Sequence, residues 1–277
     1  MKKVTSSIPY NYITIKTTKS RIENGLLAIP VSLISQFPKS DSKIYVLNDK
    51  GKEEAKTYTP YQSSSRECRI GGIRAFYSKY KIKDGDEIVI QILDEFKYKI
   101  IPEKSFNERI KKLENNFEKS INDIEAEQNI KNLSYATNKS SIEVIQSEFV
   151  RLSQKEIYKR KTKLIPSTKT KESVPASLRK ILIFLYDGKC QISGFTFIMK
   201  NGNPYFEIHH IDSSKGNHIK NLLVVSPNIH AQFTYTDPEH YFDSDSWLRK
   251  VRLNDNTYTV FQIIDKLPKY FEKEIHS

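Results

Sequence analysis

Residues 205–233 read YFEIHHIDSSKGNHIKNLLVVSPNIHAQF, and this stretch decides how the C-terminal third of the chain is interpreted. Tyr205–Ile208 has the composition of a strand, and it leads directly into His209 and His210. A loop containing Gly216 follows, then Asn221 with the apolar run 222–225, and then a helix that begins near Ile229. Histidines therefore stand between strand, turn and helix signals, which favours a functional site over a chance pair.

The pattern suits a site that binds a divalent metal. Neighbouring residues on a strand point to opposite sides, so His209 and His210 are predicted to do different jobs. One imidazole can face a metal held against the following helix, where His230 closes the site. The other can take a proton from water, because imidazole titrates near neutral pH. An ion with open positions can then clamp a scissile phosphate.

The residues before this stretch extend the motif. Residues 177–186 are predicted to form a helix, and Asp187-Gly188-Lys189-Cys190-Gln191-Ile192-Ser193-Gly194 a turn. Together, residues 177–235 resemble the HNH nuclease family, whose fold is a ββα-metal unit. The resemblance implies that His209 and His230 are metal ligands, that His210 is the general base, and that Asn221 orders the loop that orients the base. It implies Mg²⁺, or another divalent ion such as Mn²⁺, as cofactor.

The sequence departs from the zinc-carrying branch of that family. Ser193 stands at the second cysteine position of the first pair, and Ser226 and Ile229 stand where the second pair would be. A structural zinc is therefore not expected, and apolar packing is expected in its place. Asp212 and Asn228 are weaker candidates for supporting the site, and His218 and His240 are predicted to be surface residues.

The N-terminal hundred residues differ in composition from the rest. The chain carries a formal net charge of +12, of which residues 1–100 contribute +7 and residues 175–277 only +1. Short β-rich segments at 13–17, 26–29, 43–47, 54–58 and 87–92, with a short helix at 72–80, predict a small barrel-like domain. A basic surface of this kind suits a polyanion, because neutralised phosphates release counterions.

This region has its own resemblance. Gly25–Pro30, Val46–Lys52 and Gly71–Phe76 are similar to the plant B-three-type DNA-binding pseudobarrel, a fold shared with the effector domain of the EcoRII restriction enzyme. The resemblance implies two arms that grip the major groove of double-stranded DNA, one near residues 16–24 and one near 62–69. The candidate DNA-contacting residues are Lys16, Thr18, Lys19, Ser20, Arg21, Asn24, Gln62, Ser64, Arg66, Glu67 and Arg69.

The middle of the chain is predicted to be helical. Phe106, Ile110, Leu113, Phe117, Ile121 and Ile124 form an apolar stripe at helical spacing. A second helix is expected over about 140–162. The stripe is either a dimerising coiled coil or the buried side of a helix packed on a neighbour, and a homodimer is expected because one HNH site cuts one strand.

These observations predict a multidomain α+β protein. Its parts are a DNA-binding pseudobarrel at 1–101, a helical connector at 102–163, a linker at 164–174 and an HNH domain at 175–277. The interpretation is a sequence-specific type II restriction endonuclease. The alternatives are a modification-dependent nuclease, a non-specific nuclease, and a DNA-binding regulator whose HNH unit is inactive. No apolar run approaches the roughly 18 residues that span a bilayer, no signal peptide is recognised, and two cysteines allow no disulfide framework. A cytoplasmic protein of a prokaryote without membrane partners is expected.

Overall fold

The computed structural model describes residues 2–5, 12–48, 51–61, 67–159, 173–267 and 272–276. The chain is a mixed α+β protein with two compact units, which comprise Met1–Lys112 with Tyr270–Ser277, and Leu113–Lys269. The C-terminal segment thus belongs with the N-terminal unit, whereas the sequence-based division placed it with residues 175–269. Among the described residues, every helix is too short or too polar to cross a lipid bilayer.

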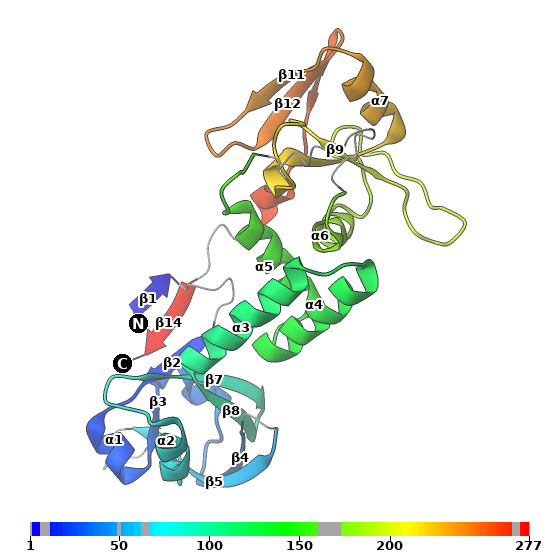
Figure 1. The fold of residues 1–277 in the computed structure, drawn as a ribbon. Coiled ribbons are helices and arrows are strands. Elements are labelled where there is room, and N and C mark those ends of the chain that lie inside the picture. Colours follow the sequence, from blue (N-terminus) through cyan, green and yellow to red (C-terminus); the bar gives the residue numbers. More distant parts are fainter. Residues whose placement is uncertain are drawn as a thin grey trace, which may run out of the picture. The chain divides into compact units, whose positions relative to one another are not determined.

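The first unit is built on a nearly closed sheet (Figure 1). Within the described residues, seven of its strands run in the order β2-β7-β8-β4-β5-β6-β3, and the outer two, β2 and β3, contact each other. Their bounds are β2 Ile13–Lys16, β3 Leu27–Ile29, β4 Ser42–Leu47, β5 Glu53–Thr59, β6 Cys68–Gly71, β7 Glu87–Asp94 and β8 Lys97–Pro102. Beyond β2 the sheet continues with β14 (Glu272–His276), parallel to β2, and β1 (Lys2–Thr5). The barrel-like fold was predicted; β6 and β8 were not.

Alternation of apolar and polar residues produces the barrel core. In β4, Ile44 and Val46 are buried while Lys43 and Tyr45 are exposed, which is the two-residue period of a half-buried strand. Phe37 follows the 3-10 helix Val31–Gln36 and stacks on Tyr98 with ring centroids 4.3 Å apart. The apolar face of the sheet therefore closes around its own side chains.

Two short helices lie side by side against the barrel (Figure 1). Thr18 caps α1 (Lys19–Asn24) by accepting a hydrogen bond from the backbone N–H of Arg21. Gly25 ends this helix with φ of 65°, and a Cβ there would lie 3.0 Å from Cβ of Arg74, the first residue of α2 (Arg74–Tyr80). Glycine is needed here for both its backbone conformation and the close approach of α2.

The apolar stripe at 106–124 is not one helix. α3 (Glu103–Glu118) ends before Ser120, and α4 (Asp123–Thr137) starts a new helix. Asn122 caps α4 by accepting from the backbone N–H of Glu125 at 2.9 Å, and the Glu125 carboxylate accepts from the N–H of Ile121 at 2.9 Å. Ile121 and Ile124 are exposed as a result, at 85% and 83%.

Three of the other four stripe residues are buried, and the fourth, Leu113, is partly buried. Phe106, Ile110 and Phe117 are at most 1% exposed, and Phe106 packs on Tyr12. Of the two interpretations, the buried side of a packed helix therefore holds for Phe106, Ile110 and Phe117. The second predicted helix is also shorter than expected: α5 covers Ser141–Ser153.

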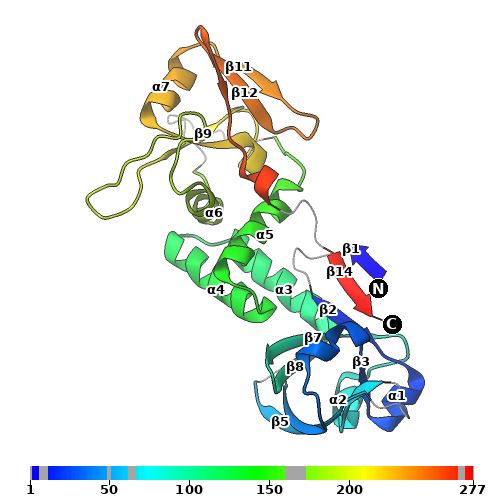
Figure 2. The same cartoon turned by 180° about the vertical axis from the view of Figure 1, so that it is seen from behind.

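In the second unit, α4 and α5 pack on each other and on α6 (Ala176–Tyr186). The two-stranded sheet of β9 (Glu207–His210) and β10 (Leu222–Val225) is followed by α7 (Pro227–Tyr235). A three-stranded antiparallel sheet comes next, made of β11 (Glu239–Phe242), β12 (Leu248–Leu253) and β13 (Asn256–Thr259) (Figure 2). This last sheet was not predicted. Most of the predicted linker lies outside the described residues.

A buried ionic cluster joins α3 and α5. Glu148 is fully buried and bonds Arg151, whose Nη1 also lies 2.6 Å from Oε1 of Glu118. Lys155 reaches the other oxygen of Glu118 at 2.6 Å. Burial by itself raises the pKa of Glu118, but hydrogen bonds from Lys155 and Arg151 outweigh it, so that the pKa is lowered. The charges are thus compensated inside the unit.

His218 corrects a sequence-based expectation, because it is buried and not on the surface. Its side chain is 4% exposed, its Nδ1 accepts from the N–H of Lys220 at 3.2 Å, and its Nε2 donates to the carbonyl of Lys155 at 3.0 Å. Both ring nitrogens are therefore used by the neutral imidazole. Burial lowers the pKa of His218 below its ordinary value of 6.5.

Replacing Arg151 should destabilise the second unit strongly. We expect Arg151→Leu to lower the free energy of unfolding by about 3–5 kcal/mol, because it removes the counter-charge that is bonded to the buried carboxylate of Glu148. Urea titration followed by the fluorescence of Trp247, the single tryptophan, measures this in the relevant unit. Lys131→Leu is the control, since its pair with Glu127 is exposed to solvent and contributes little to stability. A loss below about 1 kcal/mol in Arg151→Leu would refute the account.

The pKa of His218 predicts a pH dependence of stability. The native state binds this proton less readily than the unfolded chain, so stability is fully present above about pH 6.5 and falls as the pH drops through that value. We expect urea midpoints of the parent to fall between pH 7.5 and 5.5 more steeply than those of His218→Gln. His240, whose pKa burial also lowers, is present in both proteins, so the difference isolates His218. Parallel pH profiles would contradict the prediction.

Candidate functional site: the β9–β10 hairpin, α7 and the barrel arms

The hairpin and α7 bring the two predicted metal ligands, His209 and His230, together. In the antiparallel pair, His209 stands opposite Leu223, and α7 packs against β9. The ring of His209 stacks on Phe233 of α7 at 4.3 Å and lies 5.3 Å from the ring of His230, centroid to centroid. Two imidazoles that are 21 positions apart in sequence are therefore neighbours in space.

Glu207 joins this group, and the sequence reasoning missed it. Its carboxylate is bonded to Nδ1 of His230, and the hydroxyl of Tyr205 donates to its other oxygen at 2.8 Å. The hydrogen bond to His230 lowers the pKa of Glu207. The sequence did contain a signal for Glu207, because the two-residue period of a strand places residue 207 on the same side as residue 209. In the part of the chain that the structure describes, no three His, Cys, Asp or Glu side chains are grouped so as to hold a metal ion.

His210 has different partners from His209. It stands opposite Leu222 in the hairpin, and its Nε2 lies 2.9 Å from Oδ1 of Asn217 in the loop that follows. It is partly exposed. The predicted base and the two predicted metal ligands thus belong to the same hairpin and helix but make separate contacts.

Asn221 holds the loop between the two strands. Its Oδ1 accepts from the backbone N–H of Asp212 at 3.0 Å, and its Nδ2 donates to the carbonyls of Asp212 and Gly216 at 3.1 and 3.2 Å. The residue is 3% exposed. Gly216 is required at its position because a Cβ there would lie 2.3 Å from the ring of Tyr158. The side chain of Asn221 therefore orders the loop that carries Asn217.

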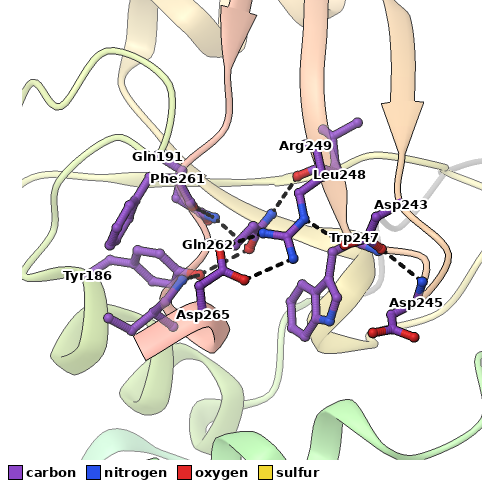
Figure 3. A network of polar contacts seen from close by, with 11 residues as sticks. Tyr186, Gln191, Asp243, Asp245, Trp247, Leu248, Arg249, Phe261, Gln262 and Asp265 are labelled. Atoms are coloured by element: carbon purple, nitrogen blue, oxygen red, sulfur yellow. Dashed lines mark hydrogen bonds and ion pairs between the residues drawn. The ribbon is translucent and has the colours of Figure 1, made fainter. Parts of the chain in front are cut away.

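Two buried amides, Gln191 and Gln262, form a network of hydrogen bonds near β10, and part of it is drawn in Figure 3. Gln191 accepts from the backbone N–H of Val224 at 2.8 Å and donates to the carbonyl of Phe261 at 2.9 Å. Gln262 donates to the carbonyl of Leu248 in β12 at 2.9 Å. Each buried amide is satisfied, so β10 is tied to the turn at 187–194 and to the three-stranded sheet.

The positions at which the zinc-carrying branch has cysteines are occupied here by Cys190, Ser193, Ser226 and Ile229. Cys190 and Ile229 lie in one apolar cluster. Burial by itself raises the pKa of the Cys190 thiol, but hydrogen bonds from Ser193 and from backbone N–H groups at 192, 193 and 226 outweigh it and lower the pKa. Among these four positions the chain offers one thiol, two hydroxyls and an aliphatic side chain, which is a poor donor set for zinc.

In the first unit, the two predicted arms come together at α1 and β6. Arg21 of α1 forms an ion pair with Glu67 at 3.0 Å, and β3 pairs with β6 so that Ala28 faces Arg69. Thr18, Lys19, Ser20 and Asn24 cap or form α1, next to the exposed Lys16 at the end of β2. Asn24 donates to the carbonyl of Ser20 at 2.8 Å. Gln62, Ser64 and Arg66 lie outside the described residues.

Comparison with known proteins identifies no family. No family model matches the sequence, and no curated protein matches it. Among solved structures, the chain is similar to one described as "Arabidopsis FUS3-DNA complex", with 18% sequence identity over 31% of this chain and 91% of that one. The TM-score is 0.27, a value at which the likeness carries no argument. The case for a function therefore rests on the residues of this chain.

Proposed function

We propose that this protein is a DNA endonuclease in which the first unit binds double-stranded DNA and the hairpin with α7 cuts it. The observation that carries the proposal is the convergence of His209 and His230, with Glu207 on Nδ1 of His230, on a hairpin whose loop is ordered by Asn221. The same hairpin carries a further imidazole, His210. A ligand pair, a base and an ordered loop in one small unit fit metal-assisted phosphodiester hydrolysis.

The donor set fits a divalent ion with open positions. His209 and His230 would hold it, and the carboxylate of Glu207 would keep His230 oriented by holding its Nδ1. When bound, the ion would supply positive charge to the scissile phosphate. Imidazole ligands suit transition metals better than Mg²⁺, so Mn²⁺ should be tested beside the Mg²⁺ that the family resemblance implies.

The protein side chains would do the remaining work. His210 would take the proton from the attacking water, and Asn221 would hold the loop that faces it. Cleavage of both strands would require two copies. Because Phe106, Ile110 and Phe117 are buried within one chain, a homodimer would have to use another surface.

The DNA-binding part of the proposal rests on charge and position. Lys16 and Lys19 are exposed at the place where α1 and β6 bring the two arms together. Their ammonium groups can neutralise phosphates, while Arg21, Asn24 and Arg69 offer donors suited to base edges. Sequence-specific restriction is the favoured activity. The alternatives are dependence on a modified base, non-specific cutting, and DNA binding without cleavage.

Cleavage is tested with supercoiled, unmodified plasmid in Mg²⁺ or Mn²⁺. We expect the parent to nick or cut, and His210→Ala to lose at least about 100-fold in rate, because general-base catalysis contributes about 10²–10⁴-fold. His276→Ala, a histidine of the first unit, is the control and should cut at the parental rate. Equal rates in the parent and His210→Ala would reject the assigned base. Cutting restricted to methylated plasmid would favour dependence on modification, and no cutting of either would favour a regulator.

DNA binding is tested with a charge-reversal pair in the absence of metal. Lys16→Glu with Lys19→Glu should weaken binding of duplex DNA about tenfold or more and reduce the salt dependence of log K by about two, one for each lost phosphate contact. Lys43→Glu with Lys104→Glu makes the same charge change at exposed positions of the same unit outside the arms. If both pairs weaken binding equally, only net charge matters and the arms are not the interface.

A further inference from the structure

One hydrogen bond fixes the direction in which the oxygen and the nitrogen of the Asn217 amide point. Its Nδ2 lies 3.2 Å from the backbone carbonyl oxygen of Ser173, and a carbonyl oxygen only accepts hydrogen bonds. The amide nitrogen must therefore face Ser173, and Oδ1 must face away from it. Asn217 is 8% exposed, so water does not compete freely for either end.

This orientation determines the proton on His210. The Oδ1 atom of Asn217 is an acceptor and lies 2.9 Å from Nε2 of His210, so this ring nitrogen must carry the hydrogen. In a neutral imidazole the lone pair then resides on Nδ1. The bond to Asn217 is the one hydrogen bond of the His210 side chain within the described part of the chain.

We propose that Asn217 is a positioning residue, which holds His210 as the Nε2–H tautomer and presents Nδ1 as the atom that accepts the proton from water. The catalytic consequence of this inference rests on the proposed nuclease function, whereas the hydrogen-bond geometry does not. Asn217 touches neither water nor phosphate in this role and acts only through the ring of His210. The loop that Asn221 orders would thus serve to place the Asn217 amide.

The chain itself supports a role beyond loop structure. His218, the next residue, uses both ring nitrogens in structural contacts to Lys155 and Lys220, and it already anchors the loop. Asn221 and Gly216 fix the loop backbone. The contact of Asn217 to the partly exposed His210 adds little to an anchored loop, whereas it decides which nitrogen of the ring is free.

The test combines a spectroscopic readout with kinetics. In ¹⁵N-histidine-labelled full-length protein, we expect the parent to show a slowly exchanging imidazole N–H signal that is assigned to Nε2 of His210 by its absence in His210→Ala. Asn217→Leu keeps the approximate size of the side chain but offers no acceptor, so this signal should be lost. Asn217→Asp retains an acceptor oxygen and should keep it. Asn115→Leu, on the exposed side of α3, is the matched control.

The kinetic arm distinguishes positioning from folding. Asn217→Leu should lower kcat for plasmid cleavage by about 10- to 100-fold, as is typical for groups that orient a functional imidazole, with KM for DNA unchanged. Asn217→Asp should recover most of kcat. If Asn217→Leu does not fold, Asn217→Ser, with its shorter side chain, replaces it in both arms.

The outcomes separate this inference from the proposed function. Persistence of the Nε2–H signal in Asn217→Leu would overturn the positioning role whether or not the protein cuts DNA. Loss of the signal together with an unchanged kcat would overturn its catalytic consequence. A parent that shows the signal, yet cuts no DNA in either metal, would refute the nuclease proposal while leaving the assignment of the tautomer in place.

Discussion

The candidate site of the second unit depends on the buried amide of Asn221. Asn221 ends the loop between β9 and β10, and its side chain satisfies three backbone groups of that loop, at Asp212 and Gly216. A buried backbone polar group without a partner costs about 1–3 kcal/mol, so a loop of this length needs a side chain that forms hydrogen bonds with its backbone. With the loop held, β9 and β10 can pair in register up to the loop. His209 and His210 then have different neighbours.

Contacts around the hairpin hold its histidines in defined positions. Gln191 ties β10 to the turn at 187–194 and to the residues after β13, and His218 ties the loop to the end of α5. Phe233 supports the ring of His209, and Glu207 holds His230. Satisfied networks such as that of Gln191 restrict side chains to single arrangements, which a site that handles protons and a metal requires.

The first unit follows a simpler constraint. A sheet with one apolar face must close on itself or be covered, and the seven strands from β2 to β3 nearly close. Antiparallel pairing of β3 with β6 brings Arg21 beside Glu67, although these residues are 46 positions apart. The proximity of the two arms is therefore a consequence of strand order, and local sequence carries no trace of it.

Much of this protein was determined by sequence alone, wherever a short-range rule applied. The two-residue period predicted most strands of the barrel, and apolar residues at helical spacing predicted α6. A helix was predicted to begin near Ile229, where α7 begins at Pro227, and the residue types at 209, 210, 221 and 230 marked the candidate site. The tertiary structure decided what depends on distant partners. It buried His218, whose partner is the carbonyl of Lys155. It also placed Glu207 on His230 and Asn217 on His210. These contacts join residues through a strand pairing and a loop conformation, and neither is encoded in the spacing of residue types along the chain.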